Sequence, residues 1–216
     1  MTALAAPQTP AAPRLTRRRA ALILAAGLPV LGCPIAALWA AIAPPIHGVV
    51  ALTHSGEHVM AYLGNEADHL FVAPSLLLGL LVIAAVVAAT VAWQWRAHRG
   101  PGMVAGLSVG VAAMSGLAAL IGAVTVHHRY GTVDVDAAPV TPAQRVYYVT
   151  QAPPVFYGHS LPQIAATILL PVAAAAVIYG LCATWSARDD LGGYPPEPTP
   201  PAMTRTTTTP RRANPR

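Results

Sequence analysis

The sequence predicts an all-α membrane protein, a four-transmembrane-helix bundle with a small β-hairpin-containing extracytoplasmic cap. Three observations predict this fold class: four long apolar runs, an arginine distribution biased to one side of them, and two β-prone runs around a short turn. The chain has 216 residues, of which 55% are hydrophobic and only 10% are charged. A chain of this composition lacks the surface chemistry of an ordinary soluble domain.

The four apolar runs cover about residues 20–43, 71–93, 103–126 and 161–185. Each has about the 20 residues that a helix needs to cross roughly 30 Å of hydrocarbon. None of them contains Asp, Glu, Lys, Arg or His. We therefore expect one membrane domain over residues 20–188.

Two polar segments flank this domain, a leader over residues 1–19 and a tail over residues 189–216. The leader is rich in Ala, Pro and Thr, and the tail in Pro, Thr and Arg, so neither can bury a core. We expect both segments to be disordered and cytoplasmic.

Arginine placement predicts the orientation of the chain. The arginines that precede the first run, separate the second from the third, or follow the fourth are Arg14, Arg17, Arg18, Arg19, Arg96, Arg99 and Arg188. The loop 44–70 has no arginine, and the loop 127–160 has only Arg129 and Arg145. By the positive-inside rule both termini are cytoplasmic and the two longer loops face outward, in a multi-pass protein of a bacterial cell (inner) membrane.

The N-terminal region has features of a processed signal. Arg17, Arg18 and Arg19 before an apolar run resemble a twin-arginine signal, and the segment 30–33 loosely resembles a lipobox ending at Cys33. Pro34 directly after the cysteine and an apolar run that continues to residue 43 favour an uncleaved span instead. Both cysteines of the chain lie within predicted spans, so we expect them to be packing residues and not a disulfide.

The first outward loop predicts a hairpin. β-prone runs at 48–53 and 58–63 flank a turn at 55–57, and 64–68 is a second turn before the next span. The second outward loop has a β-like run at 132–136 and an aromatic run at 145–149. We expect the two loops to pair into a small extracytoplasmic cap.

Small residues repeat along the third run. The positions that we expect to pack against a neighbouring helix are Gly102, Gly106, Gly110, Ala118 and Gly122. Helices in a bilayer associate by close backbone approach over such residues. A tight intramolecular bundle is the favoured interpretation, with homodimerisation or docking on a larger complex as the alternative. Pro29, Pro34 and Pro171 predict bends in the first and fourth spans.

One segment matches a catalytic metal motif. His54, Glu57 and His58 fit the H-x-x-E-H pattern of inverted zinc metallopeptidases, in which a helix presents both imidazoles on one face. Here Gly56 and the flanking β-prone runs predict a turn, and a third ligand would have to come from Glu66, Asp68 or His69. We expect these side chains to be ordinary polar residues of solvent-exposed loops. An extracytoplasmic metal-binding or proton-sensing surface is the remote alternative.

Other chemistry has little support in the spans. Carriers usually need an intramembrane charge, and haem ligation there would need histidine, whereas the apolar runs contain neither. The chain has no nucleotide-binding loop and no basic stripe interleaved with aromatics. We therefore expect a protein that is not an enzyme, with no cofactor and no nucleic-acid partner.

The order of several segments resembles a known family. These segments are 31–39 with Ala43 and Pro44, then 65–71 at the end of the hairpin, then 76–79 at the start of a Gly-bearing second span. In these features the chain is similar to the actinobacterial four-span membrane proteins grouped as domain of unknown function family 2567. The resemblance covers about residues 20–188. It implies a four-helix membrane architecture, and no activity or catalytic residue.

Two functional hypotheses follow. The favoured one is a non-enzymatic structural or accessory component that packs with other membrane proteins, or with itself, in the lipid bilayer. The glycine stripe and the small outward cap motivate it. The alternative is a small oligomeric channel or permeation subunit, lined by Thr and Ser on one face of the third and fourth spans.

Overall fold

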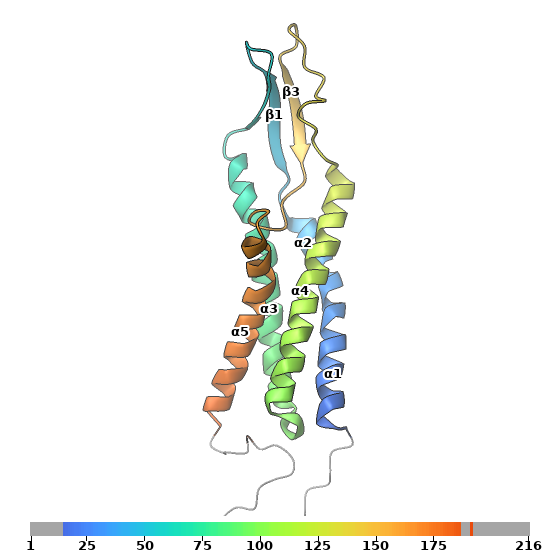
Figure 1. Ribbon diagram of the computed structural model, residues 1–216, viewed down its shortest axis with the longest axis vertical. Coiled ribbons are helices and arrows are strands. Elements are labelled where there is room, and N and C mark those ends of the chain that lie inside the picture. Colours follow the sequence, from blue (N-terminus) through green and yellow to red (C-terminus); the bar gives the residue numbers. More distant parts are fainter. Residues whose placement is uncertain (1–14, 187–190, 192–216) are drawn as a thin grey trace, which may run out of the picture.

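The computed structural model describes residues 15–186 and residue 191. The predicted disorder of the leader and the tail falls almost wholly outside this part of the chain. The described part has long helices side by side along one axis, with a sheet projecting beyond one end of them (Figure 1). We refer to the two ends of the molecule as the sheet end and the arginine end, the latter containing Arg17, Arg96 and Arg99.

The elements follow one another in simple order. They are α1 (Arg17–Gly27), η1 (Leu28–Leu31), α2 (Gly32–Ile42), β1 (Ile46–Leu52), β2 (His58–Tyr62), η2 (Glu66–Asp68), α3 (His69–Gln94), η3 (Arg96–His98), α4 (Pro101–Tyr130), β3 (Val146–Gln151) and α5 (Leu161–Thr184). The helical stretch from α1 through α2, and the helices α3, α4 and α5, are each long and apolar enough to cross a membrane by length and composition. The four predicted runs are thus confirmed as helices.

The first helical stretch is interrupted where the sequence places its prolines. A 3₁₀ turn at Leu28–Leu31 separates α1 from α2 and contains Pro29. Pro34 lies in the first turn of α2, where backbone N–H groups have no hydrogen-bond partner within the helix, so a proline there removes no bond of α2. The interruption is therefore at Pro29. Pro171 lies inside α5, which continues across it.

The cap is a three-stranded antiparallel sheet in the order β2-β1-β3. The predicted hairpin is confirmed as β1 and β2, and the aromatic run becomes β3, so the two loops do pair. Val50 of β1 is opposite Met60 on one side and Tyr147 on the other.

The strand expected at 132–136 is wrong. A carboxylate oxygen of Asp134 accepts hydrogen bonds from the backbone N–H groups of Asp136 and Ala137, at 3.1 and 3.2 Å. Such a side-chain bond to the following backbone forms a turn, and here it overrides the β-branched composition.

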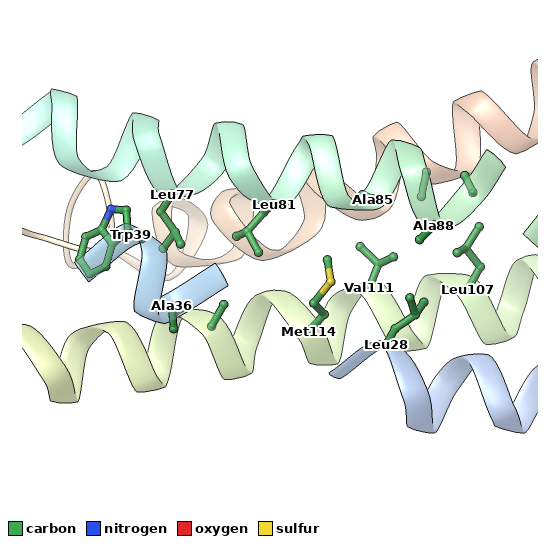
Figure 2. Packing of buried hydrophobic residues seen from close by; sticks show 14 of the residues in the cluster. Leu28, Ala36, Trp39, Leu77, Leu81, Ala85, Ala88, Leu107, Val111 and Met114 are labelled. Atoms are coloured by element: carbon green, nitrogen blue, oxygen red, sulfur yellow. The ribbon is translucent and has the colours of Figure 1, made fainter. Parts of the chain in front are cut away.

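The core lies between α4 and the other helices. Figure 2 shows Leu77 of α3 beside Trp39 of α2, and Leu81 of α3 on the side that faces Met114 of α4. Trp39 of α2 is fully buried at the sheet end of this cluster, and its indole N–H donates to the carbonyl of Ala73 at 2.8 Å. The interior of the helical part is therefore closely packed and almost entirely apolar.

Candidate functional site

Glycines of α4 bring it close to α1 and α2. A Cβ added at Gly106 would lie 2.5 Å from the carbonyl oxygen of Ala21, and one added at Gly110 would lie 2.8 Å from that of Leu24. A Cβ at Gly122 would lie 2.9 Å from the Trp39 ring. These three glycines of the predicted stripe therefore pack against residues of the same chain.

The two remaining stripe positions differ from each other. Ala118 is fully buried, and its backbone nitrogen would be 3.2 Å from a Cβ added at Gly32 of α2. Gly102 has nothing within 4 Å of an added Cβ, because it is the second residue of α4 and lies before the contact with α1 begins. Within this chain the close contacts of the stripe therefore start at Gly106, and the packing role of Gly102 stays a prediction.

The sheet presents one open apolar face. Paired residues of antiparallel strands lie on the same face, and faces alternate along each strand. By the observed register, one face contains Val49, Ala51, Val59, Ala61, Val146 and Tyr148. We call these six residues the open sheet face.

The two faces differ in burial mainly along the central strand β1. On the open sheet face Tyr148 is 71% exposed, Val59 46% and Val146 43%. On the opposite face Ile46 and Val50 of β1 are completely buried, while Tyr62 and Tyr147 on the outer strands are 39% and 42% exposed. A contiguous exposed apolar surface of this kind is typical of interaction sites. The open sheet face offers mainly apolar contact surface, which is suited to docking another surface.

A hollow adjoins the edge strand β3. Its volume is about 440 Å³, and it lies between β3 and the segment that follows α4. Tyr130, Asp134, Tyr148 and Thr150 are among its lining residues. It adds hydroxyl groups and a carboxylate beside the open sheet face, which would give a docked partner polar contacts.

A group that we call the polar junction attaches the sheet to the helices. One carboxylate oxygen of Glu66 accepts from the backbone N–H of His47 at 2.9 Å and lies 3.2 Å from Nδ1 of the same histidine. Nδ1 of His69 lies 3.0 Å from that oxygen and 2.9 Å from the carbonyl of Pro45. Because the start of β1, η2 and the first residue of α3 meet at this oxygen, the junction fixes the sheet relative to α3.

Electrostatics at the junction favour the ionised carboxylate. The pKa of Glu66 is lowered, chiefly by the hydrogen bond from the backbone N–H of His47 and further by both histidine side chains. Sequence reasoning missed the pair His47 and Glu66, which are 19 residues apart. The spacing of Glu66 and His69 at a helix start was the available signal.

The metal candidates do not come together. His54 and Glu57 lie in the turn of the hairpin, His58 begins β2, and His69 belongs to the polar junction. The segment is a turn, as expected, and not the helix that the motif requires. Among the described residues no group of three or more His, Cys, Asp or Glu could hold a metal ion.

Aromatic and basic groups close the arginine end. The Arg99 guanidinium lies 3.9 Å from the centre of the Trp93 ring, and its Nε donates to the Trp93 carbonyl at 2.9 Å. The Tyr179 ring meets Trp93 edge to face, and its hydroxyl accepts from the N–H of Gly100 at 3.3 Å. Burial, followed by the nearby Arg96, lowers the pKa of Arg99 from its ordinary value. These contacts fix the turn between α3 and α4.

Comparison with known proteins gives relatives without an assigned activity. The family model described as "Protein of unknown function (DUF2567)" matches residues 28–193. The uncharacterized protein Rv1591 of Mycobacterium tuberculosis is 50% identical over 187 residues, which cover 86% of this chain and 97% of that protein. The uncharacterized protein ML1222 of Mycobacterium leprae is 53% identical over 167 residues, covering 77% and 84% respectively. No solved structure matches the chain.

Proposed function

The chain belongs to the DUF2567 family of proteins of unknown function, and we propose that it is a non-enzymatic membrane protein that packs with another membrane protein through its sheet. Its four apolar helical stretches support membrane insertion. The arginine end then faces the cytoplasm, and the sheet extends from the outer surface of the bilayer.

The open sheet face carries the proposal. Its exposed Val59, Val146 and Tyr148 lie on strands, which hold them in a fixed arrangement. Interfaces concentrate their energy in aromatic and aliphatic side chains of this kind. A sheet standing beyond the helices places this surface within reach of the outward part of a neighbouring membrane protein.

The helices support an anchoring role. The small residues of α4 from Gly106 onward are already in contact with α1 and α2, so they serve packing inside the chain. The helices therefore contribute a stable base, and the sheet is the part available for a partner.

Site-specific photocrosslinking in native membranes tests the proposal. A photoreactive amino acid at Val146 or Tyr148 reports on the open sheet face, and one at Ser55 in the exposed hairpin turn serves as the matched control. We expect both face positions to give an adduct with the same membrane protein, identified by mass spectrometry, and the turn position to give none.

Two results would contradict the proposal. Adducts of equal yield from all three positions would show unspecific proximity. Adducts formed only between two copies of this chain would show that the partner is a second copy of the chain and not another membrane protein.

A further inference from the structure

The outer edge of β3 has open backbone hydrogen-bonding groups. The backbone N–H of Leu52 donates to the carbonyl of Arg145 at 2.9 Å, which makes these residues a hydrogen-bonded pair at the end of the β1–β3 ladder. In an antiparallel ladder such pairs alternate with pairs whose N–H and C=O groups point away from each other. By the observed register, Val146, Tyr148 and Thr150 therefore direct these groups away from β1. Within the described residues, no backbone hydrogen bond reaches them from that side.

The composition of β3 favours pairing with a further strand. Natural proteins protect edge strands with charged residues, proline or bulges. The six residues Val146–Gln151 include no charged residue, no proline and no glycine. Five of the six are β-branched or aromatic, the residue types that are enriched in strands. The edge of β3 is therefore a template for another extended chain.

The hollow beside β3 follows this edge. Four consecutive residues of β3, 147–150, line it. Successive side chains of a strand point to opposite faces, so a space that meets all four lies along the backbone edge and not over one face. Four residues correspond to roughly 13 Å of strand. The segment that follows α4 forms the far wall (Figure 1), with Thr132, Asp134 and Pro139 among the lining residues.

The far wall limits what can occupy the hollow. A helix is about 10–12 Å across, so roughly 13 Å of helix would need on the order of 1,000 Å³. The hollow offers about 440 Å³. The β3 strand of a second copy would bring its own β1 about 4.8 Å behind it, where the wall already lies. A single extended segment, which also needs about 4.8 Å beside β3, satisfies both limits.

From these observations we infer that β3 binds one extended segment from the outward part of the neighbouring membrane protein, as a fourth strand of the sheet. The backbone of that segment bonds to the open N–H and C=O groups of β3. Its side chains toward the wall carry hydrogen-bond donors, because Tyr130, Thr132 and Asp134 present hydroxyl and carboxylate oxygens there. The binding mode rests on the proposed function, since it specifies how the proposed partner is held.

Mapping of crosslinked positions in native membranes tests this strand pairing. Photoreactive amino acids are placed singly at Val146, Tyr148 and Thr150 of the full-length chain, and the crosslinked residue of the partner is identified by mass spectrometry. Side chains of paired strands advance together. We therefore expect each step of two residues along β3 to move the crosslinked position by two residues along one continuous segment of the partner.

A proline at the open edge gives a second test. Thr150→Pro removes an N–H that points away from β1, so the ladder within the chain is kept while the partner loses a bond. We expect the adduct yield from a crosslinker at Val146 to fall at least about fivefold, the effect of one lost backbone hydrogen bond.

The matched control is a proline at the other edge of the sheet. The N–H of Thr53 donates to the carbonyl of Glu57 at 2.9 Å, so by the same alternation the N–H of Met60 on β2 points away from β1. Met60→Pro should leave the adduct yield unchanged. The mapping of crosslinked positions uses no proline variant, so it decides the question even where a proline loosens the sheet.

The outcomes separate strand pairing from the proposed function. Crosslinked positions that scatter over the partner, or that advance by three or four residues as on a helix, overturn strand pairing and leave the proposed function standing. A yield that both proline variants lower equally, or that neither lowers, does the same. Absence of an adduct with another membrane protein from both Val146 and Tyr148 overturns both.

Discussion

The two ends of the molecule use apolar residues in opposite ways. In the helical part, glycines and alanines of α4 bring backbones together, and the larger side chains fill the space between α3 and α4. In the sheet, Ile46 and Val50 of β1 are buried on one face, whereas Val59, Val146 and Tyr148 stay exposed on the other. The small-residue contacts of α4 are made within one chain, whereas the sheet leaves apolar side chains uncovered, and this contrast underlies the proposed interface.

The largest effect is expected where two backbones meet. Gly106→Leu places a side chain against the backbone of Ala21, so we expect α1 to be displaced and unfolding to become about 3 kcal/mol easier. Circular dichroism during thermal unfolding in detergent measures the change. Gly116→Leu, at a glycine of the same helix with open space around it, should leave the melting temperature nearly unchanged. Similar losses for both variants would show that α1 is not held by this contact.

The next effect concerns the junction of α2 with α3. Trp39→Phe removes the indole N–H that bonds to Ala73 and leaves unfilled volume beside Gly122, so we expect a loss of about 2 kcal/mol. The control Trp185→Phe changes a side chain that is 83% exposed. The same unfolding measurement applies, and a Trp39 variant as stable as the control would refute tight packing at this position.

A smaller, pH-dependent effect is expected at the polar junction. The pKa of Glu66 is lower in the folded chain than its ordinary value of 4.5. Its contribution to stability is therefore present above that value and is lost as the pH falls through the folded pKa. We expect Glu66→Gln to melt at a lower temperature than wild type at pH 7, and the difference to vanish once the pH is below the lowered pKa of Glu66, where the wild-type carboxylate is also neutral. A constant difference at every pH would contradict this role.

The smallest effect on stability is expected on the open sheet face. Tyr148→Asp changes an exposed side chain, so the free energy of unfolding should move by no more than about 0.5 kcal/mol. The same change should abolish the adduct formed from a crosslinker at Val146, because it places a charge in the proposed interface. Ser55→Asp in the hairpin turn is the control that keeps the adduct. A large loss of stability for Tyr148→Asp would show that the face is part of the folding core.

Much of the helical part was predictable because its signals are local. Apolar runs of sufficient length become helices whatever their partners, and Pro29 marks the interruption between α1 and α2. The hairpin was equally predictable from β-prone runs on both sides of Gly56, which has a positive φ of 86°. The strand expected at 132–136 failed because a single side chain, Asp134, stabilises a turn there.

The candidate site was less accessible to sequence reasoning because it depends on pairing. The open sheet face appears only when β3 is placed beside β1, and the chain separates these strands by α3 and α4. The polar junction likewise joins His47 to Glu66 across the hairpin, whereas the sequence draws attention to His54, Glu57 and His58. Proximity along the chain was a poor guide to proximity in space at this end.

The burial of Trp39 also gives the protein a built-in optical probe. The chain has four tryptophans, and the others, at positions 93, 95 and 185, lie at the arginine end. Trp39 is completely shielded at the sheet end, while Trp185 is 83% exposed. We expect Trp39 to emit at shorter wavelength and to resist water-soluble quenchers more than Trp185 does. One fluorescence spectrum can thus follow the two ends of the molecule separately, without an added label.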